Sequence, residues 1–179
     1  MRLVILDRDG VINADSPDFI KSPAEWRPLP GSLEALARLA AAGRTVVVAS
    51  NQSGVGRGLL SLETLAEIHD AMCRQVAAAG GRIDRVFFCP HRPDEGCDCR
   101  KPRPGLFRQV AAHYRVDLAG VPAIGDSLRD IDAARAAGAR PMLILTGNGA
   151  EARRAAASPV ETYPDLGAAV DAILGENNH

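Results

Sequence analysis

The sequence predicts an α/β fold, a Rossmann-like doubly wound parallel sheet in one domain that spans residues 1–179. Short apolar runs of strand length alternate with longer segments of helical spacing from one end of the chain to the other. The run Val46-Val47-Val48 is apolar on both faces, which is typical of a strand that helices cover on both sides. Because 46% of the residues are hydrophobic, the chain can bury a substantial core.

The first half of the chain gives two strand and helix pairs. Residues 3–6 are four aliphatic side chains in a row and predict the first strand, and residues 32–42 predict a helix that ends in three alanines before a glycine. Residues 45–49 contain the three valines and predict the second strand. The helix expected over residues 62–79 also ends in alanines followed by glycine.

The alternation continues through the second half. Residues 85–88 are a third apolar run, and residues 105–114 have helical spacing. Two further strands are expected at 121–124 and 141–145, and two further helices at 131–137 and 166–174. No repeat, linker or low-complexity segment interrupts the pattern, so a parallel sheet is favoured over separate domains.

Charge and hydropathy exclude several classes of partner. With 21 basic and 22 acidic residues the net charge is -1, which indicates neither a nucleic-acid-binding nor an anionic membrane-binding surface. No apolar stretch approaches the roughly 18 residues that a membrane span requires, and charged residues interrupt the first apolar run too early for a secretory leader. We therefore expect a cytoplasmic protein, and a monomer because no helix shows a sustained heptad pattern.

Polar residues gather where the predicted strands end. In a doubly wound sheet, ligands bind beyond the carboxyl ends of the strands. Three strands are followed there by Asp7 and Asp9, by Ser50, Asn51 and Gln52, and by Asp126 and Ser127. A cationic pair, Arg100 and Lys101, precedes the helix expected over residues 105–114. Each group alone could be a turn or a helix cap, but their joint occurrence favours one site at this edge.

A phosphate group with a divalent cation could use two or three carboxylates and a lysine at once. Mg²⁺ prefers oxygen ligands and bridges a carboxylate to a phosphoryl group. Asp7 could then attack phosphorus and form an aspartyl-phosphate, while Asp9 transfers the protons. Ser50, Asn51 and Lys101 would stabilise the phosphoryl oxygens.

Four strings of residues resemble a known family. DRDGVIN at 7–13, SNQSG at 50–54, RKP at 100–102 and GDSLRD at 125–130 are similar to the four ordered motifs of the haloacid dehalogenase (HAD) superfamily of aspartate-nucleophile phosphatases. The resemblance implies Asp7 as nucleophile, Asp9 as acid/base, Ser50 and Lys101 on the phosphate, and Mg²⁺ held by Asp7, the Asp9 carbonyl and Asp126. Asp130 stays open between a supporting role behind the site and a helix-starting acid. The short spacing between the motifs leaves no room for a cap domain.

A second cluster of potential ligands lies in the loop over residues 89–99. Three thiols and one imidazole, from Cys89, His91, Cys97 and Cys99, form the ligand set of a closed tetrahedral Zn²⁺ site. The loop has little apolar material of its own, so coordination would supply its order. Since Cys99 is two residues before Lys101, zinc there should be structural and should anchor the segment that carries Arg100 and Lys101. The fourth cysteine, Cys73, stands apart and is expected to be a small core residue.

Loops around an uncapped site would select the substrate. Arg57 and Arg100 could meet a second anionic group, while Asp15, Ser16 and Asp18 could accept from hydroxyl groups, a pattern that suits a phosphorylated sugar. Either arginine could equally be a solvated surface residue.

With the zinc loop included, nearly the whole chain resembles the heptose 1,7-bisphosphate 7-phosphatases of bacterial lipopolysaccharide-heptose synthesis, with NQSGVGRG and CDCRKP as the most similar strings. That resemblance implies removal of the C7 phosphate in the cytoplasm, Arg100 on the substrate, and Ser50, Asn51, Gln52 and Ser53 along the pocket. Ser127 departs from the pattern, because some relatives have a lysine there. That departure puts one phosphate contact in doubt and leaves the anomer preference open.

Two alternatives remain at this point. Histidinol-phosphate phosphatases share a compact Cys/His loop, but their cationic substrate would favour an acid where this chain has Arg57. A receiver that merely holds a phosphoryl group on aspartate would also use an acidic edge and a lysine, but would not need an acid/base two residues beyond the nucleophile.

Overall fold

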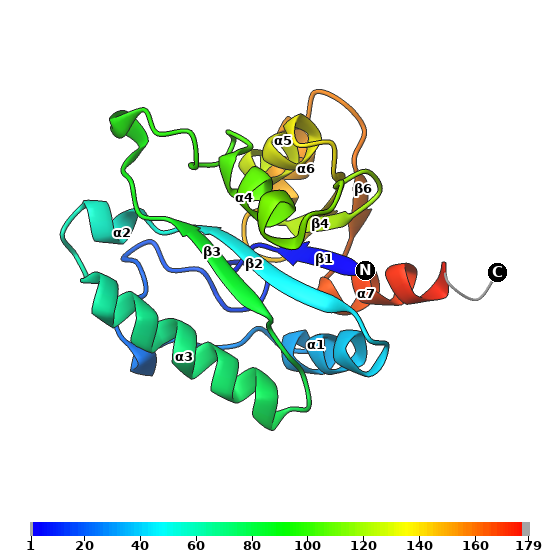
Figure 1. Ribbon diagram of the computed structural model, residues 1–179, viewed down its shortest axis with the longest axis horizontal. Coiled ribbons are helices and arrows are strands. Elements are labelled where there is room, and N and C mark those ends of the chain that lie inside the picture. Colours follow the sequence, from blue (N-terminus) through cyan, green and yellow to red (C-terminus); the bar gives the residue numbers. More distant parts are fainter. Residues whose placement is uncertain (1, 177–179) are drawn as a thin grey trace.

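Six parallel strands form one central sheet in the computed structural model, which describes residues 2–176 (Figure 1). The strands are β1 (Leu3–Leu6), β2 (Thr45–Asn51), β3 (Arg85–Cys89), β4 (Pro122–Gly125), β5 (Arg140–Ile144) and β6 (Glu161–Tyr163). Their order is β3-β2-β1-β4-β5-β6, and each neighbouring pair is parallel. The predicted α/β class with a parallel sheet is confirmed.

Helices cover both faces of the sheet. They are α1 (Ser32–Ala41), α2 (Ser53–Gly56), α3 (Leu62–Ala78), α4 (Gly105–Tyr114), α5 (Leu128–Ala136), α6 (Gly149–Ala155) and α7 (Leu166–Gly175), with short 3-10 turns η1 (Pro23–Glu25) and η2 (Pro93–Glu95). Helices α1, α3 and α7 pack on one face, and α4, α5 and α6 on the other (Figure 1). The sheet is therefore doubly wound, as the alternating pattern predicts.

The strands are buried on both sides. In β1, Val4 and Leu6 belong to the core under α1, α3 and α7, whereas Leu3 and Ile5 belong to the core under α4 and α5. The valines of β2 divide between the two cores in the same alternating way. This two-sided burial explains why the strands read as continuous apolar runs.

The chain reverses its direction of winding between β1 and β4. From β1 it proceeds outward to β2 and β3, and it then returns to place β4 on the other side of β1. Such a switch point opens a crevice at the carboxyl ends of the two central strands, where ligands bind in folds of this kind. Asp7 leaves β1 there and Asp126 leaves β4 there.

Some elements differ from the expectation. Helix α5 begins at Leu128, three residues earlier than predicted, because Ser127 caps it. The helices α2 and α6 and the strand β6 were not predicted. Each is short, and none has the apolar periodicity that identifies longer elements.

Across residues 2–176, none of the helices combines the length and the apolar character that crossing a membrane requires.

Candidate active site and metal centre

The carboxyl ends of β1, β2 and β4 surround a cavity of about 330 Å³. The predicted residues that line this cavity are Asp7, Asp9, Asp15, Ser16, Asn51, Gln52, Ser53, Arg57, Arg100, Lys101, Asp126 and Ser127. Ser50 is instead buried within β2, where its hydroxyl accepts a hydrogen bond from Gln52. Asp18 lies exposed on the loop nearby, outside the lining. The structure thus brings together most of the residues that the sequence indicated.

Lys101 is buried among three oxygen acceptors. Its Nζ donates to the carbonyl oxygen of Ala49 at 2.7 Å and pairs with Asp7 Oδ1 at 3.0 Å and Asp130 Oδ1 at 2.6 Å. Burial alone would lower the pKa of Lys101, but the charges of Asp130 and Asp7 outweigh it and hold that pKa above its ordinary value. Lys101 therefore remains a cation in a fixed position.

The acidic side of the pocket carries more negative charge than Lys101 neutralises. Burial raises the pKa of Asp7 to about 8, against the opposing effect of Lys101 and with a further contribution from Asp130. Burial also raises the pKa of Asp126 to about 6, although the backbone N–H of Asn148 opposes it. For Asp130, Lys101 more than offsets the effect of burial and holds the pKa below its ordinary value. A cation bound between Asp7 and Asp126 would remove this imbalance.

Among the described residues, two groups of three or more potential metal ligands have all their donor atoms within 4.8 Å of one another, and these acids form one of them. The group comprises Asp7, Asp126 and Asp130. Both oxygens of Asp130 are engaged, because Oδ1 pairs with Lys101 and Oδ2 accepts from the Ser127 backbone N–H at 3.0 Å and hydroxyl at 2.7 Å. Asp7 and Asp126 are therefore the better ligands, and their carboxylates suit a hard ion such as Mg²⁺.

Two glycines let neighbouring loops close on Asp126. Gly10 follows β1 with φ +77°, and Gly147 follows β5 with φ +55°. A Cβ atom at these positions would lie 2.0 Å and 2.2 Å from Asp126 Oδ2. Next to Gly147, the Asn148 backbone N–H donates to the same Oδ2 at 2.8 Å. The carboxylate is thus enclosed by backbone that larger residues could not form.

Asp9 is held by five hydrogen bonds from three side chains. Arg8 donates from Nε and Nη2 to Oδ1 at 3.1 Å and 2.9 Å, and from Nη2 to Oδ2 at 3.1 Å. Asn13 donates to Oδ1 and Gln52 to Oδ2, each at 2.9 Å. The orientation of the Asp9 carboxylate is therefore set by its neighbours.

Asn51 links strand β2 to the segment that carries the lysine. Its Nδ2 donates to the carbonyl oxygen of Lys101, and its Oδ1 accepts from the Lys101 backbone N–H, both at 3.0 Å. This reciprocal pair fixes the main chain of Lys101 directly to the sheet.

Ser127 and Asp130 form the N-terminal cap of α5. The Ser127 backbone N–H donates to the Asp130 carboxylate, as in a capping box, and the Ser127 hydroxyl donates to the same oxygen. Asp130 therefore combines the two roles that the sequence left open, since it also pairs with Lys101. Ser127 lines the cavity, but its hydroxyl donates to this cap.

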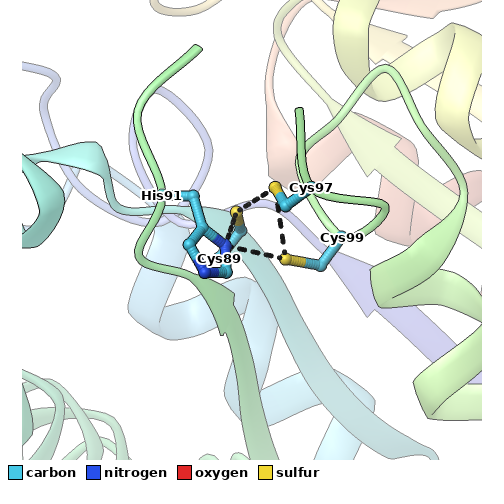
Figure 2. A group of neighbouring side chains, drawn as sticks. All are labelled: Cys89, His91, Cys97 and Cys99. Atoms are coloured by element: carbon cyan, nitrogen blue, oxygen red, sulfur yellow. Dashed lines mark hydrogen bonds between the residues drawn. The ribbon is translucent and has the colours of Figure 1, made fainter. Parts of the chain in front are cut away.

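The Cys/His cluster has the geometry of a tetrahedral metal site (Figure 2). Sγ of Cys97 lies 3.6 Å from Sγ of both Cys89 and Cys99. Nδ1 of His91 lies 3.5 Å from Cys89 Sγ and 3.3 Å from Cys99 Sγ. Four such donors about 2.3 Å from a central zinc would be separated by about 3.8 Å between sulfurs, and by slightly less from sulfur to nitrogen. The donor set and its spacing therefore fit Zn²⁺ with no open position.

The cluster lies beside the cationic side of the pocket. The cluster's Cys99 is followed directly by Arg100, whose Nη1 donates to the carbonyl oxygen of His91 at 3.3 Å. Arg57, Arg100 and Arg129 all line the cavity. Burial lowers the pKa of Arg100, and the neighbouring charge of Arg129 lowers it further. Because Arg57 and Arg129 both lie close enough to lower the pKa of Arg100, these three arginines form a cationic wall of the pocket.

Sequence reasoning missed several residues of the site: Arg8, Asn13, His69, Arg129 and Asn148. Asn148 follows β5 at the edge where the other polar residues were found, so the same signal could have identified it. His69 occupies the apolar face of α3 together with Leu65 and Met72, and a histidine on such a face is a visible exception. Arg8, between two aspartates in a motif, gives no comparable signal.

Two family models match the chain. The model described as polynucleotide kinase 3 phosphatase matches residues 3–127, and the HAD-hydrolase-like model matches residues 98–169.

Similar proteins have one recurring name. Over 178 residues, the chain is 55% identical to the D-glycero-β-D-manno-heptose-1,7-bisphosphate 7-phosphatase of Bordetella bronchiseptica, with 98% of this chain and 99% of that protein covered. The Pseudomonas aeruginosa protein of the same name is 49% identical, with 96% and 97% covered. A crystal structure of the D,D-heptose 1,7-bisphosphate phosphatase from B. bronchiseptica with magnesium and phosphate is 54% identical and superposes with a TM-score of 0.96 over 98% of this chain and 99% of that one.

Proposed function

The chain belongs to the family of D-glycero-β-D-manno-heptose-1,7-bisphosphate 7-phosphatases within the HAD-like hydrolases, and we propose that it hydrolyses the C7 phosphate of that bisphosphate in the ADP-heptose pathway of lipopolysaccharide core synthesis. The names of the relatives specify the β anomer, and we extend that preference to this chain. The observation that carries the proposal is 55% identity over nearly the full length, together with the cluster of Asp7, Lys101 and Asp130 at the switch point.

The reaction would proceed in two displacements at phosphorus. In the first, an oxygen of Asp7 forms a bond to the C7 phosphorus, the bond between phosphorus and O7 breaks, and Asp9 donates a proton to the departing O7. In the second, Asp9 takes a proton from water, the water oxygen bonds to phosphorus, and the bond to Asp7 breaks, which releases inorganic phosphate. Magnesium, when bound, supplies positive charge that lets Asp7 approach the anionic phosphate.

Lys101 would neutralise the phosphoryl oxygens in both steps. Its Nζ already lies 3.0 Å from Asp7 Oδ1, and the Asn51 pair and Asp130 keep it there. Because this charge is in place before substrate binds, no reorganisation is needed during the transfer. We also propose that Ser50 contributes to this phosphate site from within β2 through Gln52, with which it is hydrogen-bonded.

The cationic wall favours a substrate with a second anionic group. Arg57, Arg100 and Arg129 face the cavity, whereas histidinol phosphate would place a cation there. Like charges would repel that substrate, so the bisphosphate is the better match. Asp15 and Ser16 in the lining, and Asp18 on the same loop, would meet the hydroxyl groups of the sugar.

Two metals complete the proposal. Mg²⁺ would be held by Asp7, the Asp9 carbonyl and Asp126, and Zn²⁺ by Cys89, His91, Cys97 and Cys99. Magnesium would serve the chemistry, whereas zinc would be structural, because all four of its positions are filled by the chain.

The remaining expectations form part of the same proposal. We infer that residues 1–179 act as a single-domain monomer in the cytoplasm, with a small phosphorylated sugar as partner and neither nucleic acid nor membrane bound.

Competing substrates test this function most directly. We expect kcat/KM with Mg²⁺ to be highest for the β anomer of D-glycero-D-manno-heptose 1,7-bisphosphate, lower for the α anomer, and lowest for histidinol phosphate. A preference for histidinol phosphate would reverse the assignment. A phosphorylated Asp7 that persists for minutes, without release of inorganic phosphate, would instead indicate a receiver.

A further inference from the structure

Behind Asp9, a short series of buried polar side chains leads to helix α3. Arg8, which donates three of the five hydrogen bonds to Asp9, is 1% exposed. Its remaining terminal nitrogen, Nη1, lies 3.3 Å from Nε2 of His69, which is 8% exposed. The order of contacts is therefore His69, Arg8, Asp9.

The donor and acceptor roles in this series follow from the chemistry of the guanidinium group. A guanidinium group has donors only, so Arg8 Nη1 must donate and His69 Nε2 must accept. His69 must then be neutral, with its proton on Nδ1. Burial and, to a smaller extent, the adjacent charge of Arg8 lower the pKa of His69 to about 4, which agrees with a neutral ring at pH 7.

His69 is itself held in place by the core. It lies on the buried face of α3 between Leu65 and Met72, which are fully buried. Its ring also contacts Phe88 of β3, with the ring centres 5.8 Å apart and the planes at 56°. Since the ring has little freedom, it offers Arg8 an acceptor at a fixed position.

We propose that His69 is a positioning residue for the phosphatase reaction, which acts through Arg8 to hold the carboxylate of Asp9 in the orientation needed for proton transfer. The proposal rests on the proposed role of Asp9 as acid/base. A buried donor that loses its acceptor is costly, so Arg8 without His69 would turn toward another acceptor. Its Nε and Nη2 would then leave Asp9, although the fold around them would remain.

Two matched variants of the full-length, metal-loaded enzyme test this role. His69→Phe keeps a ring of similar size against Phe88 but removes the acceptor, whereas His69→Gln removes the ring but can accept through Oε1. We expect His69→Phe to lower kcat/KM for the heptose bisphosphate about 10- to 100-fold, because acid/base assistance contributes roughly 10²- to 10⁴-fold. We expect KM to change little, and His69→Gln to recover most of the loss.

The leaving group separates positioning of the acid from general damage. A sugar alkoxide needs a proton to depart, whereas 4-nitrophenolate departs without one. We therefore expect kcat/KM of His69→Phe for 4-nitrophenyl phosphate to stay within about 3-fold of wild type. Thermal unfolding of both variants identifies any loss of folded protein.

Two results would overturn the proposal. One is an equal loss of kcat/KM for the alkyl and the aryl phosphate in His69→Phe, and the other is a His69→Gln variant as impaired as His69→Phe. If the wild-type enzyme does not hydrolyse heptose bisphosphate, that result would contradict the proposed function but not the role of His69. In that case, an alkyl phosphate that the enzyme does hydrolyse takes the place of the sugar in the same comparison.

Discussion

The acidic cluster and the Cys/His cluster are both potential metal sites, but they are built in opposite ways. Asp126 is 3% exposed and follows the central strand β4, and Lys101 is 2% exposed and is hydrogen-bonded to Ala49 and Asn51 of β2, so the sheet fixes both. Cys97 and Cys99 are only partly buried, in a loop whose sole regular element among residues 90–104 is the 3-10 turn Pro93–Glu95. We therefore expect the acidic cluster to keep its arrangement without a metal, whereas the Cys/His loop would gain its order from a bound metal.

The two regions meet at Arg100 and Lys101. The Cys/His loop holds Arg100 through His91, while Lys101 is held from the other side by Asn51 and Asp130. Loss of the loop should therefore disturb Arg100 more than Lys101. Variants of the two regions should therefore separate effects on the chemical step from effects on substrate binding.

The largest effect is expected for Asp7→Asn. Because this variant lacks the proposed nucleophile, kcat for Mg²⁺-dependent phosphate release should fall by about 10⁴-fold or more. The fold and the zinc content should be unchanged, because the amide has the same shape and the Cys/His loop is not touched. A phosphate-release assay, thermal unfolding and elemental analysis measure the three. Turnover close to wild type would end the account.

The next effect is expected for Cys97→Ala, which removes one of the four proposed zinc ligands. Zinc content should fall from one per chain to none, and KM should rise about 10-fold, equivalent to about 1.4 kcal/mol, as Arg100 loses its support. The value of kcat should change less than 3-fold, because Lys101 keeps its other anchors. Cys73→Ala is the matched control, since Cys73 lies outside the cluster. Elemental analysis that finds no zinc in purified wild-type protein would contradict this prediction.

A smaller effect, on stability, is expected from pH. The pKa of folded His69, about 4, lies below its ordinary value of 6.5, so the unfolded chain binds the proton first as pH falls. Stability is therefore lost from about pH 6.5 down to about pH 4, with about 2 kcal/mol lost between pH 7 and pH 5. Denaturant unfolding at both pH values measures this contribution. The free energy of unfolding should fall between pH 7 and pH 5 by about 2 kcal/mol more in wild type than in His69→Phe. An equal fall in the free energy of unfolding of the two proteins would contradict this prediction.

The smallest effect is expected in a double-mutant cycle between the two regions. Asn51→Ala removes the two hydrogen bonds to the main chain of Lys101, and Cys97→Ala loosens the segment from the loop side. Because either anchor can hold the segment, each single variant should change kcat only slightly. The activation free energy calculated from kcat should rise in the double variant by about 1 kcal/mol more than the sum of the two single increases. Additive losses would show that the two regions act independently.

The sequence was most informative where the chain is regular. Strand β1 and helix α4 were predicted with the bounds that the structure has, because continuous aliphatic residues and clear helical spacing dominate there. Strand β6 was missed because its three residues are only half-buried and lie at the sheet edge. The start of α5 was predicted too late because the polar residues Arg129 and Asp130 separate its first residue, Leu128, from the apolar spacing that begins at Ile131.

The residues of the site show the same contrast between regular elements, which the sequence predicts well, and irregular ones, which it does not. Asp7, Asp9 and Asp126 could be found because they follow apolar strands, and Lys101 because it lies in a recognisable motif. The partners of Asp9 could not be foreseen in the same way. Arg8 lies just beyond β1, where strand alternation would point it away from Asp9, yet it donates three hydrogen bonds to Asp9 and contacts His69.

The central claim is that Asp7 becomes phosphorylated, and a beryllium fluoride complex tests it most directly. A structure of the enzyme with Mg²⁺ and beryllium fluoride should show the fluoride adduct on a carboxylate oxygen of Asp7, next to Lys101 Nζ. An adduct on any other side chain, or none under conditions where the compound inhibits turnover, would contradict the account.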